Sequence, residues 1–274
     1  MHNPLVPETL EGWSILHLMY RVNWDAIRRL QDVDVRRISD EAVRALAVPD
    51  AGATAFVQML GHKGDLMLIC FRRDFEQLAQ AQLALSRTEL HALLEPTTSY
   101  VSIVELGMYE MTGKLHQQLG AKHKPASDEF ESAFDAEMET QRQRVMNRLF
   151  LEVPKSRYVC FYPMNKKRDG GDNWYSESFE KRAAMMREHG MIGRTYAGKV
   201  TQVISGSIGY DDWEWGVDLF AQDPIVFKKL IYEMRFDEAS ARFAEFGPFY
   251  TGLQFAPAQL ASYLGGSVPA LEIL

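Results

Sequence analysis

The order of strands and helices predicted for the second half of the chain limits the fold more than any other feature. Apolar segments, alternating or continuous, predict strands, and a segment with helical periodicity that stops before Gly190 predicts a helix. A polar turn at 209–212 joins two of the strands. Strand, helix, strand, strand, helix, strand is the ferredoxin-like order, so we expect an α+β fold. The predicted strands are 157–163, 199–208, 213–220 and 247–255, and the predicted helices are 176–189 and 223–236, followed by a short helix up to 246.

The first half of the chain follows a similar alternation. Strands are predicted at 13–22, 65–72 and 99–106, and helices at 39–47 and 75–90. Between the halves, 116–125 is polar and interrupted by Gly and Pro, which marks a connector, and 127–149 predicts a charged helix. We therefore expect an N-terminal ferredoxin-like half at 1–115, a connector and helix at 116–150, and a C-terminal ferredoxin-like half at 151–274. Two such halves would pack sheet to sheet and enclose a cavity.

The composition is that of an ordinary soluble globular protein, with 46% hydrophobic and 24% charged residues. A length of 274 residues fits either one large domain or two fused smaller units. The formal net charge of −7 argues against a general nucleic-acid binder, so no nucleic-acid partner is expected. A local basic pocket for a small anion remains open.

The cysteines and the chain terminus suggest a compartment. Cys70 and Cys160 lie within apolar runs, which indicates buried thiols rather than a disulfide. The first residues lack the pattern of a secretory signal, and no apolar stretch approaches the length of a membrane span. We therefore expect a cytoplasmic protein with no membrane span.

Tyr162 lies near the end of the strand predicted at 157–163. Alternation places it on the same strand face as Cys160 and Met164. The simplest interpretation is a core tyrosine, since aromatic residues are common on strands. Three basic residues, Lys166 to Arg168, follow just beyond the strand end, where a loop can surround an anion. The segment therefore favours an anion-binding site beside a phenol.

His189 stands at the edge of an apolar helix face, in the last turn before Gly190. Its ordinary interpretation is a histidine that stabilises a helix C-terminus through the helix dipole. A zinc site is disfavoured because zinc takes three or four protein ligands and no His, Cys, Asp or Glu cluster surrounds His189. Haem iron needs only one axial protein ligand, because the porphyrin supplies the other four. A haem therefore fits this histidine better than a bare metal ion does.

Gln202 is a polar residue on an otherwise apolar face of the strand predicted at 199–208. A buried amide must find hydrogen-bond partners or line a cavity. It is therefore either a satisfied core amide or a neutral group that faces a ligand.

Four strings in the C-terminal half carry a specific resemblance. They are YPMNKKR from Tyr162, HGMIGRTYAGKV from His189, GSIGYDDWEWGVDLFAQDP from Gly206 and YEMRFDEASARFAEFGPFY from Tyr232. With them, the chain resembles the coproheme decarboxylase branch of the chlorite-dismutase-like superfamily. The N-terminal half agrees in element order and in SYVSIVEL from Ser99. The resemblance implies a dimeric α+β barrel made of two ferredoxin-like halves in one chain, assembled as a homopentamer.

The resemblance also implies roles for single residues. His189 would be the proximal ligand of the iron, and Tyr162 would become a radical that oxidises a propionate. Lys166 would assist at the second propionate, and Gln202 would be the distal residue. The positions that hold or flank porphyrin propionates would be Arg148, Met164, Arg194 and Ser240, and Tyr109 would match a further pocket tyrosine.

The function implied by the resemblance is peroxide-dependent oxidative decarboxylation. Two propionates of Fe-coproporphyrin III (coproheme) would become vinyl groups, giving haem b, so that coproheme serves as substrate and as redox cofactor. Hydrogen peroxide would be the oxidant, and a ferrochelatase-type enzyme would donate the coproheme. Lys166, Arg148 and Arg194 would hold the propionates through charge-assisted hydrogen bonds.

Three alternatives stay open. The first is a haem-binding carrier or sensor without turnover. The second is a chlorite dismutase-type haem enzyme, which the neutral Gln202 disfavours, because chlorite-degrading members place an arginine at the distal position. The third is a cofactor-free monooxygenase with the same barrel fold, for which His189 would be dispensable.

Overall fold

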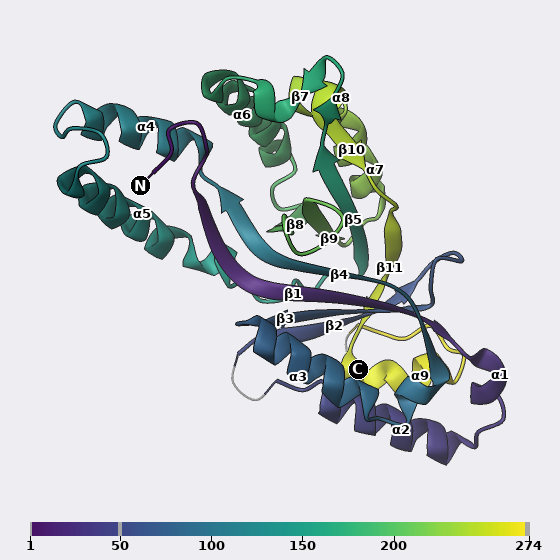
Figure 1. The fold of residues 1–274 in the computed structure, drawn as a ribbon. Helices are drawn as coiled ribbons and strands as arrows, with labels where there is room; N and C mark the ends of the chain where they lie inside the picture. Colours follow the sequence, from purple (N-terminus) through teal and green to yellow (C-terminus); the bar gives the residue numbers. More distant parts are fainter. Residues whose placement is uncertain (1, 49–50, 272–274) are drawn as a thin grey trace.

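The computed structural model describes residues 2–48 and 51–271, and its main feature is one large antiparallel sheet (Figure 1). Within these residues the sheet has nine strands, in the order β10-β5-β11-β2-β3-β1-β4-β8-β9. They are β1 (Thr9–Val22), β2 (Ala53–Met59), β3 (Leu66–Arg72), β4 (Leu94–Gly107), β5 (Tyr158–Lys166), β8 (Val200–Gly206), β9 (Trp215–Ala221), β10 (Ala244–Phe246) and β11 (Tyr250–Phe255). Two short strands, β6 (Arg168–Asp169) and β7 (Asp172–Asn173), form a separate hairpin.

The sheet closes on itself, because β9 pairs with β5 as well as with β8. Each half of the chain contributes four strands to the sheet. The N-terminal unit is β4-β1-β3-β2, and the C-terminal unit is β8-β9-β5-β11. The two units join where β2 pairs with β11 and where β4 pairs with β8. β10 and β11 both pair with β5: β11 pairs with its first residues and β10 with its last residues. The expected α+β architecture with two ferredoxin-like halves is confirmed.

Helices cover the outer faces of both halves (Figure 1). Helices α2, α3 and α9 cover the N-terminal sheet, and α7 packs on the outer face of the C-terminal sheet, with α6 and α8 beside it. Helices α4 and α5 project to one side as a hairpin. The bounds are α1 (Trp24–Ile27), α2 (Asp32–Ala45), α3 (Phe75–Ser86), α4 (Tyr109–Gly120), α5 (Asp128–Leu149), α6 (Phe179–Thr195), α7 (Ile225–Met234), α8 (Glu238–Phe243) and α9 (Leu260–Leu264), with 3₁₀ turns η1 (Leu90–Leu93), η2 (Trp174–Ser176) and η3 (Pro257–Gln259).

The interior of the barrel is filled by side chains, where we had expected an enclosed cavity. Apolar residues from both halves, such as Ile15 and Phe220, have no exposed surface there. One polar pair crosses the interior: Nε2 of His17 on β1 lies 2.9 Å from Oδ1 of Asp218 on β9. Both side chains are fully buried, and the imidazole stacks on Phe161. The packed interior therefore joins the two halves. Because it has no room for a ligand, a ligand would bind on an outer sheet face.

Several predicted boundaries were wrong. Strand β2 was missed, and α2 begins seven residues before the predicted helix at 39–47. Helix α4 covers 116–120 of the predicted connector, and the division of the chain at 115/116 falls inside it. Helix α6 does not stop at Gly190 but continues to Thr195. A glycine inside a helix costs about 1 kcal/mol relative to alanine. Packing of α6 against α4, α7 and α8 outweighs that cost.

Candidate active site

The outer face of the C-terminal sheet carries the predicted catalytic residues. Tyr162, Met164 and Lys166 alternate with inward residues on β5, so all three lie on the face toward α7 and α8. Across the sheet, Tyr162 pairs with Val217 on β9, and Val217 pairs with Ile204 on β8. Ile204 remains 41% exposed although it lies on this face. The helices therefore leave part of the sheet face beside Tyr162 accessible.

His189 lies in the body of α6, six residues before the helix ends at Thr195, so its predicted place in the last helical turn is wrong. Its Nδ1 atom lies 2.9 Å from Oδ2 of Asp237. The side chain of Asp237 is fully buried, whereas that of His189 is 28% exposed. Since a carboxylate can only accept, Nδ1 of His189 is the donor in this contact. Among the described residues Nε2 has no hydrogen-bond partner, so this nitrogen is available to a ligand.

Asp237 holds its position as the N-cap of α8, where Oδ1 accepts from the backbone N–H of Ser240 at 2.8 Å. Burial favours its neutral form, but hydrogen bonds from His189 and Ser240 outweigh that effect and lower the pKa of Asp237 below its ordinary value. A buried anion that orients an imidazole is the usual second partner of a metal-ligating histidine. Sequence reasoning missed Asp237, because an aspartate before a short helix has the signature of a simple cap.

Ser240 also belongs to this group in the structure. Its hydroxyl donates to Oδ2 of Asp237 at 3.1 Å and lies 3.3 Å from Nδ1 of His189. The place beside a porphyrin propionate that the resemblance implies for Ser240 stays a prediction. The recorded bonds put Ser240 in the network that orients His189.

Lys166 is buried beside the same network. Its ammonium donates to the carbonyl oxygen of Ala239 at 3.1 Å and lies 4.5 Å from the ring centroid of Trp174. Burial lowers the pKa of Lys166 to about 8, while the negative charges of Asp237 and Glu214 oppose that shift. The ammonium group of Lys166 therefore loses its proton near pH 8.

Tyr162 is 6% exposed, and its ring stacks on Phe249 with a centroid distance of 4.6 Å. Phe246 contacts it from a second side. Burial raises the pKa of Tyr162 well above its ordinary value. In the described part of the chain its hydroxyl has no recorded hydrogen bond. The phenol is therefore neutral at physiological pH, and its oxidation must release a proton.

The remaining predicted residues, Gln202, Arg194 and Arg148, lie on three different elements, β8, α6 and α5. Gln202 on β8 is half-buried and lies against α6. A Cβ atom added at Gly193 of α6 would be 3.7 Å from its Nε2 atom. Arg194 is exposed in the last turn of α6. Arg148 is exposed at the end of α5. The next residue, Leu149, lies against Gly12 of β1, where an added Cβ atom would be 2.0 Å from the carbonyl oxygen of Leu149. Neither arginine has a recorded ion pair with a described residue.

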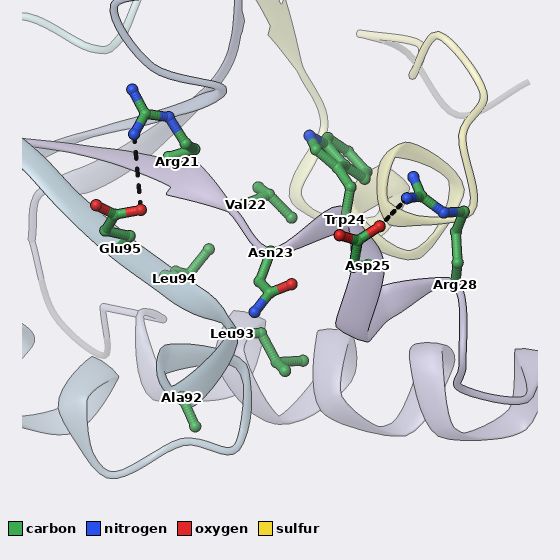
Figure 2. A pocket seen from close by; sticks show the side chains of 10 residues that line it. All are labelled: Arg21, Val22, Asn23, Trp24, Asp25, Arg28, Ala92, Leu93, Leu94 and Glu95. Carbon is green, nitrogen blue, oxygen red and sulfur yellow. Dashed lines mark hydrogen bonds and ion pairs between the residues drawn. The ribbon is translucent and has the colours of Figure 1, made fainter.

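Two surface cavities do not include His189 in their lining. Figure 2 shows one of about 470 Å³ in the N-terminal half, at the end of β1. Its charged side chains already pair with each other: Arg21 lies 3.6 Å from Glu95, and Arg28 contacts Asp25. The second, of about 330 Å³, lies beyond the end of β5 near Lys166, and is lined by Arg168, Asn173, Tyr175, Ile208 and Glu214. The first contains none of the predicted site residues and is not the candidate site.

Residues 2–48 and 51–271 hold no group of three or more His, Cys, Asp and Glu side chains arranged to bind a metal ion. They also hold no helix that is both long enough and apolar enough to cross a membrane.

Comparison with known proteins identifies the family. The sequence profile of the chlorite dismutase family matches residues 35–255. The chain belongs to the chlorite dismutase family. Coproheme decarboxylase of Staphylococcus carnosus is 43% identical over 251 residues, which cover 89% of this chain and 92% of that protein.

Solved structures of other proteins share the fold. A heme-binding protein from Thermus thermophilus matches with a TM-score of 0.80 and 39% identity, covering 97% of this chain and 100% of that one. A mutant chlorite dismutase from Candidatus Nitrospira defluvii in complex with cyanide matches with a TM-score of 0.69 and 14% identity, covering 93% and 95%. The second similarity concerns the fold alone.

Proposed function

We propose that this chlorite dismutase-family protein is a coproheme decarboxylase that converts two propionates of Fe-coproporphyrin III to vinyl groups, giving haem b. The observation that carries the proposal is the His189–Asp237 pair, which leaves a single oriented Nε2 atom free on α6. The similarity to the Staphylococcus carnosus coproheme decarboxylase supports the same reaction.

The residues present fit an iron porphyrin. One imidazole, fixed by a buried carboxylate, suits an iron whose equatorial positions are filled by the porphyrin. The accessible sheet face around Ile204 offers an apolar surface for a flat ring. Lys166, Arg148 and Arg194 supply positive charge for the propionates. When bound, the iron porphyrin and hydrogen peroxide together supply the oxidising equivalents.

In the proposed mechanism Tyr162 is the residue that passes oxidation to the substrate. Its buried phenol loses an electron and a proton, and the resulting radical takes a hydrogen atom from the β-carbon of a propionate. Loss of carbon dioxide and one further electron then leaves a vinyl group. For each vinyl group formed, one propionate, one peroxide and one proton are consumed, and one carbon dioxide and two waters are released.

Lys166 and Gln202 define the surroundings of that step. Lys166 is on the same strand and face as Tyr162, so its ammonium can hold a propionate near the phenol. Gln202 is neutral, so it cannot hold chlorite by charge as a distal arginine can. This difference favours decarboxylation over chlorite breakdown within the family.

The test is a titration of the protein with ferric coproporphyrin III followed by stepwise addition of hydrogen peroxide. Mass spectrometry of the pigment should show loss of one and then two propionates as vinyl groups. A wild-type protein that binds the pigment but releases no carbon dioxide would contradict the proposal.

A second candidate function is haem binding without turnover, supported by the similarity to the heme-binding protein of Thermus thermophilus. It requires tighter binding of haem b than of coproheme. Comparing the two affinities by absorbance titration separates the candidates, because a decarboxylase must bind its substrate and release its product. Homopentameric assembly, a cytoplasmic location and a ferrochelatase-type coproheme donor belong to the proposal as well.

A further inference from the structure

Glu105 is a half-buried carboxylate that lies on the same sheet face as Tyr162. It is on β4, where the chain alternates between the interior residues Tyr100 and Val104 and the outer face. Its Oε1 atom accepts the indole N–H of Trp215 at 3.3 Å. Its Oε2 atom lies over Gly206, where an added Cβ would come within 2.2 Å of that oxygen.

The register of four strands relates Glu105 to the catalytic residues. Met164 pairs with Trp215, Trp215 with Gly206, and Gly206 with Ile103, which precedes Glu105 by two residues on the same face. This row spans three strand spacings, or about 14 Å. The carboxylate of Glu105 therefore marks the β4 end of a row whose β5 end carries Met164, next to Tyr162. A row of this breadth is comparable to that of a substituted porphyrin.

Among the described residues Glu105 has no ion pair. Burial raises the pKa of Glu105, and the negative charge of Glu11 raises it further, while the N–H of Trp215 opposes both. Glu11 on β1 is the register partner of Glu105. The carboxylate of Glu11 already has a cation beside it, because its Oε2 atom lies 3.5 Å from Nη2 of Arg142. Glu105 is thus an acidic group without a neighbouring cation. A second carboxylate placed against it would meet repulsion or would force one of the two acids to take up a proton.

The substrate of the proposed function has an uneven distribution of carboxylates. In the type III isomer of coproporphyrin, two neighbouring pyrroles turn their methyl groups toward each other, so one ring edge carries no propionate. In the type I isomer, methyl and propionate alternate around the ring, and every edge carries a propionate. Of these two isomers, only type III can therefore present a carboxylate-free edge.

We propose that Glu105 excludes propionates from the β4 end of the site, and so selects the type III isomer by its propionate-free edge. This inference rests on the proposed function, because it takes an iron coproporphyrin as the ligand. Glu105 is then a specificity residue, while Lys166 at the β5 end receives a propionate.

Absorbance titration with ferric coproporphyrin III and ferric coproporphyrin I, without peroxide, tests the proposal. The wild type should bind the type III isomer about tenfold more tightly or better, as expected for a half-buried pair of like charges. Glu105→Gln keeps an acceptor for Trp215 and removes the charge, so it should bring the two affinities together, mainly through tighter binding of type I. Glu105→Asp keeps the charge and should keep the preference.

Glu11→Gln is the matched control, because it removes the neighbouring carboxylate that Arg142 already pairs, and it should leave the preference unchanged. A wild type that binds both isomers equally, or a Glu105→Gln variant with the wild-type preference, overturns the inference. Selective binding without peroxide-dependent decarboxylation would overturn only the proposed function. A protein that binds neither isomer overturns both.

Discussion

Nδ1 of His189 and Oδ2 of Asp237 lie 2.9 Å apart, and they come from two helices, α6 and α8. The carboxylate has no exposed surface, while the imidazole is partly exposed. This arrangement fixes which ring nitrogen carries the proton and which one can bind a ligand. Helix α8 therefore takes part in the site through its cap residue rather than through its exposed face.

Replacement of Asp237 by Asn should weaken the binding of ferric coproheme. Loss of the buried anion makes the imidazole a poorer iron ligand, and such partners typically change metal affinity or activity about 10–100-fold. Absorbance titration of the variant with ferric coproporphyrin III measures the effect. Glu238→Gln, the next residue along, removes an exposed carboxylate that pairs with Arg242 and should leave the affinity unchanged. Equal affinities for wild type and Asp237→Asn would argue against the ligand role of His189.

Replacement of Tyr162 by Phe should abolish decarboxylation while the protein still binds coproheme. The hydroxyl makes no recorded hydrogen bond within the described chain, so its loss should change the free energy of unfolding by less than about 0.5 kcal/mol. Pigment mass after peroxide addition and urea unfolding give the two readouts. Tyr158→Phe, on the same strand and face, is the control and should keep activity. Vinyl formation at the wild-type rate in Tyr162→Phe would rule out the radical role.

Burial lowers the pKa of Lys166 to about 8. The affinity for coproheme should therefore fall as the pH rises through about 8. Only the ammonium form pairs with a propionate, so deprotonation of the free protein should cost up to about tenfold in affinity per pH unit above that value. Titrations at several pH values in wild type and Lys166→Met measure this step. The step should be absent from Lys166→Met and present in Lys167→Met. A pH profile that is the same in all three proteins would contradict the assignment.

Loss of one partner of the His17–Asp218 pair should destabilise the barrel strongly. Both side chains are fully buried, and removal of one member of a buried pair typically costs about 3–5 kcal/mol. Urea unfolding of His17→Ala and Asp218→Asn measures the change in the free energy of unfolding. The double variant His17→Phe with Asp218→Leu should lose less, because no buried charge is left unpaired. A single variant as stable as wild type would show that the pair does not join the two halves.

Local signals in the sequence predicted the order of elements well and their ends less well. Helices α5 and α3 begin within one residue of the predicted starts at 127 and 75, because Ser127 and Asp74 cap them and a cap bond depends on residues within one turn. Helix α4 was missed, since Gly113 and Gly120 weaken its local pattern and its packing partners lie far away in sequence. The end of α6 was misplaced at Gly190 for the same reason: tertiary contacts, rather than local preference, continue the helix.

In the candidate site, too, local patterns in the sequence were predictive, whereas contacts between residues far apart in sequence were not. The alternation on β5 correctly put Tyr162 and Met164 on one face, because a strand has a fixed period of two. The contact of His189 with Asp237 spans 48 residues, so no spacing in the sequence indicates it. The resemblance supplied His189 as a ligand, whereas the structure supplied the partner that orients it. The residues of β4, including Glu105, lie on the same sheet face as Tyr162 only because the two sheets join at the β4–β8 seam.

The mass spectrum of the pigment after titration of the coproheme-loaded wild type with hydrogen peroxide tests the central claim most directly. We predict conversion of Fe-coproporphyrin III through a singly decarboxylated species to haem b, with release of carbon dioxide. A pigment that keeps all its propionates, or that is only bleached, would contradict the assignment of this protein as a coproheme decarboxylase.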